Sequence, residues 1–429
     1  MRAEEKFLSA IGDIEDDFIE EAAAYVPPKK NQRNRSIWKY GGALAACLIV
    51  TVVTCAALLP AEKTPGGNPL TGKEVAKLPL LTIEERQDEG QSENRTKKLP
   101  AESDSDSPET QANPWTAESG VETLPVYSNQ AYGTVVALED AANGSEQGET
   151  AMAKQVEPAE LTDRVLMTAA AAGMDADPSD VTVTGEGAAA DENEGHFVVR
   201  AETGQGTVQM SLDNEALIRF AESVELPEEY RIPADQRNED NMEETAAWLL
   251  SEYSDLTGFE SSRASAEAFW QEDGQKWIIS GCEERDDVKS QIVSYNLKRV
   301  FFQLDEAGNL SGILLRDYMA CSQEIEEYPI ISQEEAEKLL EAGEYVTKCG
   351  YDMPGTEYIR RVSLVYLAGE HYNIFMPYYA FDVQLPEGTV GDEDSGTDAF
   401  TEDYVDCGTY YVPAVKGEYI ANMPKWKKN

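Results

Sequence analysis

The chain contains only 2 histidines, His196 and His371, and these are the first residues to consider for acid–base chemistry. A Ser-His-Asp hydrolase needs a histidine as its general base beside a serine nucleophile. His196 lies in a predicted strand beside Phe197, and His371 lies in a Gly-Glu-His turn between two predicted strands. Neither has a neighbouring G-x-S-x-G motif, and no Walker loop, G-x-G-x-x-G or H-E-x-x-H motif occurs. We therefore predict a structural or surface role for both histidines, no enzyme and no cofactor.

Three aspartates near the C-terminus, Asp392, Asp394 and Asp398, have a spacing that imitates part of a calcium loop. The EF-hand pattern requires glycine at its sixth position and a glutamate that closes the loop. Thr397 occupies the glycine position, and no glutamate closes the loop. We interpret the segment as a solvated loop and predict no metal site, with weak calcium binding as the alternative.

Four cysteines follow the N-terminal apolar run described below. They are Cys282, Cys321, Cys349 and Cys407. An even number permits two disulfides with three connectivities, among which the sequence does not choose. Free buried thiols are the alternative if the organism lives without oxygen. No C-x-x-C motif occurs, so neither zinc nor redox chemistry is indicated.

The chain is strongly acidic, with 81 acidic and 35 basic residues and a formal net charge of -46. Phosphate binding needs clustered Lys and Arg, so the composition argues against a nucleic-acid binder. The same excess disfavours docking on an anionic membrane surface. Hydrophobic residues make up 41% of the 429 residues, which is enough for a folded core in two or three domains.

An uncharged apolar run over residues 41–59 separates a short N-terminal segment from the rest of the chain. Its length is close to the ~20 residues that cross the hydrocarbon core of a bilayer. Basic residues and no acids occupy 29–39, just before the run. By the positive-inside rule we predict a single transmembrane helix at 37–60, with a cytoplasmic N-terminus and the bulk of the chain outside the cell.

The predicted cytoplasmic segment, residues 1–36, holds an amphipathic helix and a basic patch. Phe7, Ile11, Ile14 and Phe18 step by helical spacing along one face, and acidic residues occupy the other face. An acidic face is wrong for the membrane surface, whereas an apolar stripe fits a groove in a cytoplasmic protein. A frayed tail without a partner is the alternative.

This order of parts carries a family resemblance. The helix FLSAIGDIEDDFIEEA, the basic patch and WKYGGALAACLIV resemble a class of single-pass membrane proteins of clostridial Firmicutes. Relatives in that class are encoded with extracytoplasmic-function sigma factors or two-component systems. The resemblance covers about the first 60 residues. It implies a signalling or envelope role, with a sigma factor or a kinase as partner of the N-terminal helix.

Residues 61–158 are rich in Gly, Pro, Ser, Thr, Asn, Gln and Glu. Such a composition buries too little apolar surface to fold alone, so we predict a flexible acidic linker. A short apolar piece at 134–138 is predicted as a strand that pairs with the domain that follows.

Residues 159–425 show globular patterning, and we predict an extracytoplasmic α+β domain. Helices are expected at about 159–173, at about 241–256 and from Ser332, where Ser332 and Glu335 form an S-x-x-E capping box. The expected strands are 181–185, 196–201, 206–212, 264–270, 276–282, 292–304, 310–317, 358–368, 372–384 and 409–421.

A helix followed by an antiparallel β-meander thus recurs three times, which suggests sub-units 159–238, 239–328 and 329–425. Helices packed on one face of antiparallel sheets are the expected architecture. The aromatic residues of 372–381, with Tyr410 and Tyr411, are predicted mainly as core, and a binding groove is the alternative.

The third sub-unit carries a second resemblance. The segments YPIISQEEAEKLL, MPYYAFDV and YYVPAV resemble the extracytoplasmic domains of YycH/YycI-type accessory proteins and PepSY-like modules. Those modules regulate kinases or proteases by protein contact, and the match covers under a quarter of the chain. We therefore expect a membrane-anchored extracytoplasmic regulatory or sensory accessory protein that acts through protein–protein contacts. A passive envelope protein and, less favoured, a cell-wall hydrolase are the alternatives.

Overall fold

The computed structural model describes eight stretches of the chain, and all of them belong to one compact unit. The described residues are 78–85, 97–100, 115–116, 119–135, 158–184, 198–271, 274–386 and 404–425. The helix expected within 1–36, with Phe7, Ile11, Ile14 and Phe18, and the span expected at 37–60 lie outside them, as do His196 and the aspartates of 392–398. Among the described residues, no helix is both long and apolar enough to cross a membrane.

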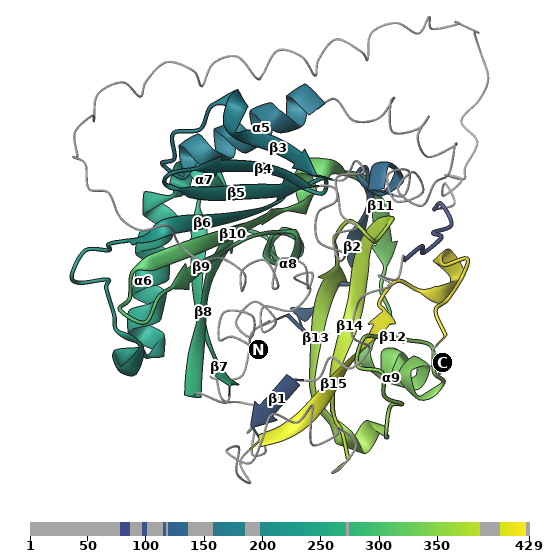
Figure 1. The fold of residues 1–429 in the computed structure, drawn as a ribbon. Helices are drawn as coiled ribbons and strands as arrows, with labels where there is room; N and C mark the ends of the chain where they lie inside the picture. The colour runs from purple at the N-terminus through teal and green to yellow at the C-terminus, as the bar shows by residue number, and fades with distance from the viewer. Residues whose placement is uncertain are drawn as a thin grey trace, which may run out of the picture. The chain divides into compact units, whose positions relative to one another are not determined.

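The described fold is α+β, as predicted, and its strands form two sheets in which all strand pairs are antiparallel (Figure 1). The first sheet has eight strands in the order β3-β4-β5-β6-β10-β9-β8-β7. Its strands are β3 (Val181–Thr184), β4 (Val198–Thr203), β5 (Gly206–Ser211), β6 (Glu215–Val224), β7 (Ser262–Gln271), β8 (Gly274–Glu283), β9 (Lys298–Leu304) and β10 (Leu310–Asp317).

This order joins two four-stranded meanders edge to edge. The seam runs between β6 and β10, where Leu217 pairs with Leu314. A helix precedes each meander: α5 (Pro158–Ala171) packs on β4 and β5, and α6 (Glu239–Glu252) packs on β7 and β8. The first two predicted repeats therefore become the two halves of one sheet.

Both helices form for reasons visible in the sequence. Leu161, Val165 and Ala169 of α5 recur every four residues and are buried, and the chain turns away at Gly173, whose φ is +80°. In α6 the side chain of Asn238 accepts a hydrogen bond from the backbone N–H of Asn241 and so caps the first turn.

The second sheet has seven strands, in the order β1-β15-β14-β2-β11, with β13 also paired to β14 and β12 to β15. Its strands are β1 (Lys97–Pro100), β2 (Thr123–Asn129), β11 (Ser322–Pro329), β12 (Val346–Thr347), β13 (Ile359–Leu367), β14 (Ile374–Gln384) and β15 (Tyr404–Pro413). Helix α9 (Gln333–Glu341) packs on β15, and its N-terminus carries the predicted capping box of Ser332 and Glu335.

The predicted linker differs from the structure at two strands. β1 and β2 both lie within 61–158, and both pair with strands of the seven-stranded sheet. Leu124 and Val126 of β2 are fully buried, so this short stretch folds because the sheet supplies the apolar partners that its neighbours lack. The prediction of a strand at 134–138 is wrong for the two of its residues that the structure describes, because residues 132–135 form a helical turn.

The prediction of a strand at 292–304 is wrong in its first half and confirmed in its second half. Residues Val288–Leu297 form helix α8, and only Lys298–Leu304 form the strand β9. The side chain of Asp287 accepts a hydrogen bond from the backbone N–H of Ser290, so an N-cap starts this helix. Ile292 and Leu297 are fully buried on α8, and tertiary packing therefore overrides the β-branched character of the segment.

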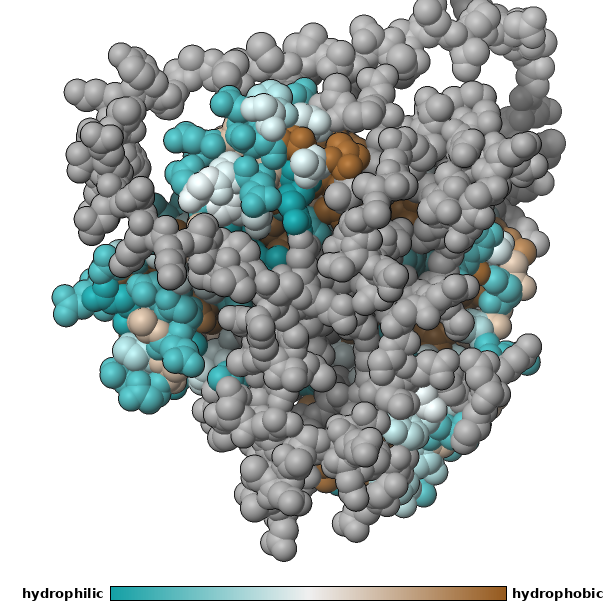
Figure 2. All heavy atoms as spheres, viewed as in Figure 1, coloured by the Kyte–Doolittle hydropathy of each residue, from teal (hydrophilic) through white to brown (hydrophobic). Residues whose placement is uncertain are grey.

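The described aromatic side chains of β14 and β15 are mainly core, as predicted. Phe375, Tyr379, Phe381 and Tyr410 are all at most 1% exposed and belong to the cluster beneath the seven-stranded sheet. A separate cluster fills the space between the eight-stranded sheet and helices α5 and α6. The described outer face over α6, at the left of Figure 2, is mostly hydrophilic, which agrees with the acidic composition.

Candidate functional site

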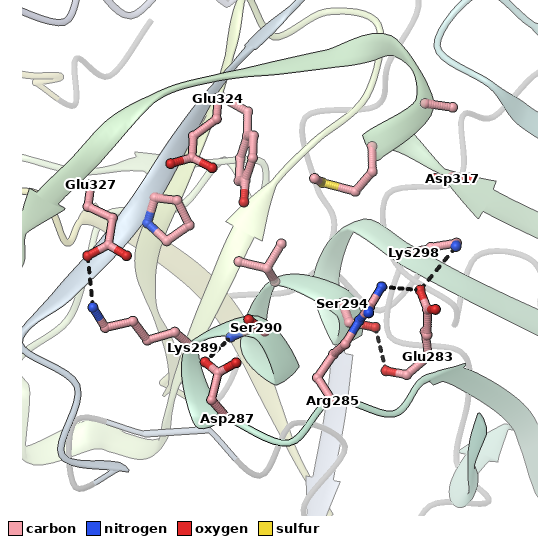
Figure 3. A pocket seen from close by; sticks show the side chains of 15 residues that line it. Glu283, Arg285, Asp287, Lys289, Ser290, Ser294, Lys298, Asp317, Glu324 and Glu327 are labelled. Atoms are coloured by element: carbon pink, nitrogen blue, oxygen red, sulfur yellow. Dashed lines mark hydrogen bonds and ion pairs between the residues drawn. The ribbon is translucent and has the colours of Figure 1, made fainter. Parts of the chain in front are cut away.

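A cleft of about 540 Å³ lies between helix α8 and the strand pair β2–β11 (Figure 3). It is lined by the end of β8, the loop and helix that follow, the start of β9, the end of β10, the 3₁₀ turn after it, and strands β2 and β11. Its lining residues are Pro125, Tyr127, Glu283, Arg285, Asp287, Lys289, Ser290, Val293, Ser294, Lys298, Asp317, Met319, Ala320, Glu324 and Glu327.

Helix α8 is anchored to the end of β8. The hydroxyl of Ser294 donates a 2.6 Å hydrogen bond to the backbone carbonyl of Glu283, and the amide of Gln291 donates another to the same oxygen. The Asp287 cap holds the first turn, and the hydrogen bond from Ser290 lowers the pKa of the Asp287 carboxyl. The polar wall that α8 presents to the cleft is therefore rigidly placed.

Glu283 is the anchor of the inner wall. Its side chain is only 4% exposed, and Oε2 lies 2.6 Å from Arg285 Nη2 and 3.1 Å from Lys298 Nζ. Burial by itself raises the pKa of this carboxyl, but the hydrogen bond and charge of Lys298 outweigh burial, so the pKa lies below its ordinary value. Glu283 is therefore ionised and shared between two cations.

Lys289 joins the two walls. Its ammonium lies 2.8 Å from Glu327 Oε2 on β11 and 2.6 Å from the hydroxyl of Thr123 on β2. The hydrogen bond from Lys289 lowers the pKa of Glu327. The dashed line in Figure 3 marks this ion pair, which joins α8 to the β2–β11 wall of the cleft.

A β-bulge in β11 decides which acids face the cleft. The register pairs Glu324 with Tyr127 and Glu327 with Pro125, and it shifts between Glu324 and Glu326. In a regular strand Glu324 and Glu326 would share a face. The extra residue of the bulge puts Glu324 and Glu327 on the cleft side, beside Tyr127 and Pro125.

Burial or nearby negative charge raises the pKa of two further groups in the cleft. Burial, together with the charges of Glu324 and Glu327, raises the pKa of the Tyr127 hydroxyl to about 12. Burial also raises the pKa of Asp317, and the Lys298 charge only partly opposes this effect. The Oδ1 atom of Asp317 is buried and has no hydrogen-bond partner. Burial therefore favours the neutral form of this carboxyl, and a cation beside it would favour the charged form.

The chemistry of the lining is that of charge recognition. Five carboxylates and three basic side chains meet in the cleft, and the described residues that line it include no histidine and no cysteine. Among the residues that the structure describes, no group of three or more His, Cys, Asp or Glu side chains is placed to hold a metal ion. The arrangement suits the binding of charged side chains from another molecule.

The residues singled out from the sequence do not gather at this cleft. No disulfide joins any two of Cys282, Cys321, Cys349 and Cys407 in the structure, and none of the four lines the cleft. Burial and the charge of Asp213 raise the pKa of Cys321 to about 12, so this thiol is unreactive at neutral pH. The connectivities left open by the sequence are not formed.

His371 is buried in the turn that precedes β14, with its Nε2 3.9 Å from Oε1 of the neighbouring Glu370. It lies in the core region of the seven-stranded sheet and does not line the cleft. The cleft residues themselves were missed by sequence reasoning. The only local signal for them was Asp287 as a cap before the apolar spacing of α8, and the strand β11 was not predicted at all.

Comparisons with known proteins add no function. No family model and no curated protein matches the chain. Among solved structures, an uncharacterized protein from Eubacterium rectale ATCC 33656 is similar over 72% of this chain and 86% of that one, with 9% identity and a TM-score of 0.31. A likeness of that size carries no argument about fold or activity.

Proposed function

We propose that this chain is a membrane-anchored extracytoplasmic accessory protein, regulatory or sensory, that acts through protein–protein contacts. The observation that carries the proposal is the charged cleft, whose walls come from both sheets. Such a cleft recognises charged groups of a partner, and whatever enters it touches elements of both halves of the domain. The sequence features of residues 1–60 support the anchoring and the cytoplasmic end.

Helix α8 gives the cleft a mechanical role. It packs on β8 and β9 of one sheet and on β13 of the other. The side-chain carbonyl of Asn296, on α8, accepts a hydrogen bond from the backbone N–H of Tyr366 on β13. A partner that displaced Lys289 from Glu327 would therefore act on a helix that packs on both sheets. A sensor needs such an element, which can bias two packed parts at once.

The cytoplasmic end would hold the regulator. In this proposal the stripe of Phe7, Ile11, Ile14 and Phe18 docks in a groove of a sigma factor or a kinase, and residues 41–59 connect it to the outer domain. The outer domain, which carries nearly all of the net charge, stays soluble at the cell surface.

The test is site-specific photo-crosslinking in the cells that make the protein. A photo-reactive residue replaces Phe7 or Ile14 of the full chain, and the matched control replaces Asp16 on the acidic face. We expect the two stripe positions, and not the control, to crosslink a sigma factor, a kinase or another signalling regulator. A chain that captures no regulator from either position, and whose deletion of residues 1–28 alters only membrane insertion, is a passive envelope protein instead.

A further inference from the structure

We infer that the cleft binds the ammonium or guanidinium group of a basic side chain from a partner protein, held at Glu324 beside Tyr127. This inference rests on the proposed function, because it specifies the chemistry of the protein contact made by the outer domain. The cleft lies on the cell-surface side in that proposal, so the partner's basic segment would also be extracytoplasmic.

The charges of the cleft do not balance. Lys289 is matched by Glu327, and Arg285 and Lys298 share Glu283. Asp287 is engaged with the first turn of α8. Among the described residues, the other two lining carboxyl groups, Glu324 and Asp317, form no ion pair with a lining cation, although the Lys298 charge acts on Asp317. The cleft therefore has five carboxyl groups against three basic side chains, and Glu324 is exposed without a cation beside it among the described residues.

The protein already binds one ammonium on this wall. Lys289 reaches across from α8 to Glu327 Oε2 at 2.8 Å, and the hydroxyl of Thr123 completes the site at 2.6 Å. The β-bulge places Glu324 on the same side of β11 as Glu327. Glu324 thus repeats the Glu327 position one step along the strand, and no lysine among the described residues forms an ion pair with it.

Tyr127 is 7% exposed and lines the cleft directly opposite Glu324 in the register of β2 and β11. Aromatic rings attract ammonium and guanidinium groups. Burial first, and then the negative charges of Glu324 and Glu327, raise the pKa of the Tyr127 hydroxyl, so the field of these two carboxylates reaches this point of the cleft. Geometry and field together therefore favour a cation at this point of the cleft.

Two observations favour a protein as the source of the cation. The volume of about 540 Å³ falls within the range of about 300–1,000 Å³ that takes several side chains or a whole ligand, far more than one ammonium. β11 also ends the strand order of the described sheet, so its outer backbone groups offer a template for an extended segment. A basic residue in such a segment would reach the cleft.

The experiment measures fluorescence anisotropy of a labelled ten-residue peptide with two lysines, added to the full chain in detergent micelles. The matched peptide carries norleucine in place of both lysines. We expect the lysine peptide to bind and the norleucine peptide to bind at least about tenfold more weakly, because a charge-assisted hydrogen bond contributes about 1.5–3 kcal/mol. Equal binding of the two peptides would overturn the inference.

Glu324→Gln provides the residue test, and Glu326→Gln is its control. The two substitutions remove the same charge from the same exposed strand, but Glu326 does not line the cleft. We expect Glu324→Gln to weaken the lysine peptide about tenfold and Glu326→Gln to leave it within about twofold. An equal loss in both variants would show general attraction to an acidic protein and reject the site. Thermal melts of both variants confirm that they fold.

Spermidine competition separates the protein source from a free amine. If spermidine binds as tightly as the peptide and displaces it, the partner-protein version is wrong. Failure of peptide binding combined with a regulator crosslinked from Phe7 would reject this inference and leave the proposed function standing. Peptide binding without a crosslinked regulator would support this inference and reject the cytoplasmic contact of the proposed function.

Discussion

The two sheets differ in how far apart in the chain their strands lie. The eight-stranded sheet uses residues 181–317 in two successive meanders, and every pairing except β6–β10 joins neighbours in sequence. The seven-stranded sheet draws on segments from Lys97 to Pro413. In it the hydroxyl of Thr123 donates to Glu327 across 204 residues. One sheet is thus built mainly from local hairpins, and the other from remote segments.

This difference indicates which part of the fold can carry a site that the sequence pattern does not reveal. Pairing the strands of a hairpin loses little chain entropy because the loop that closes them is short. Pairing of remote strands loses more chain entropy and needs strong apolar burial to offset it. The cleft lies where the remote strands β2 and β11 approach α8. The candidate site therefore depends on the sheet that the sequence pattern reveals least.

The largest effect is expected from a charge placed on β2, which tests whether this remote strand belongs to the core of the seven-stranded sheet. Val126 is fully buried, and we expect Val126→Asp to destabilise the protein by about 4–5 kcal/mol, because it buries an unpaired carboxylate. Denaturant unfolding followed by far-UV circular dichroism measures the loss. Gln130→Asp is the control, since Gln130 is exposed just beyond β2. If Val126→Asp were as mild as the control, residues 123–129 would be a linker after all.

Matched cavities in the two cores test whether the sheets unfold together. Phe302 lies in the core of the eight-stranded sheet and Phe375 in that of the seven-stranded sheet, and both are at most 1% exposed. We expect each Phe→Ala substitution to cost about 3–4 kcal/mol. Because α8 packs on both sheets, both should lower one shared transition in calorimetry. Two separated transitions, each moved by only one variant, would show that the sheets are independent.

The ion pairs of Glu283 predict how the stability of the folded protein depends on pH. The pKa of Glu283 is lower in the folded protein than its ordinary value of 4.5, so its contribution is present above that value and is lost as pH falls through the lowered pKa. We expect Glu283→Gln to cost about 2 kcal/mol at pH 7 and to flatten stability below about pH 4.5. Urea unfolding midpoints at pH 7 and pH 3.5 measure this. A variant that kept the wild-type acid slope would show that another carboxyl is responsible.

The smallest expected effect is local. Ser332→Ala removes the hydroxyl that caps α9, and we expect a loss of about 1 kcal/mol, because one backbone N–H loses its acceptor. Thermal unfolding compares it with Ser223→Ala, whose serine is exposed on β6. Equal melting temperatures for the two variants would mean that the cap contributes nothing measurable.

The sequence predicted the locally determined parts well. The spacing of Leu161, Val165 and Ala169 predicted α5, and the Ser332–Glu335 pair predicted the start of α9, because both patterns act within one or two helical turns. The turn at 305–309 is also local: the backbone N–H of Asp305 donates a hydrogen bond to the carbonyl of Asn309. Each of these signals needs no distant partner.

The sequence did not predict the strands of the cleft. β11 reads SQEIEEYP, with three glutamates and exposed positions, and such a stretch becomes a strand only because β2 lies beside it. β6 was missed as well, although it is the strand on which the two meanders meet. The helix α8 was mistaken for a strand, because its apolar positions suit either structure until packing selects one.

The sequence by itself determined the acidic excess, the apolar run at 41–59, the α+β class and the helices with caps, because composition and short-range periodicity are properties of the chain alone. Only the tertiary structure decided that β2 joins the domain, that no disulfide joins the four described cysteines, and that a bulge turns Glu324 and Glu327 to one side. A register shift of one residue reverses which side chains face the cleft, and that register is selected by contacts some 200 residues apart.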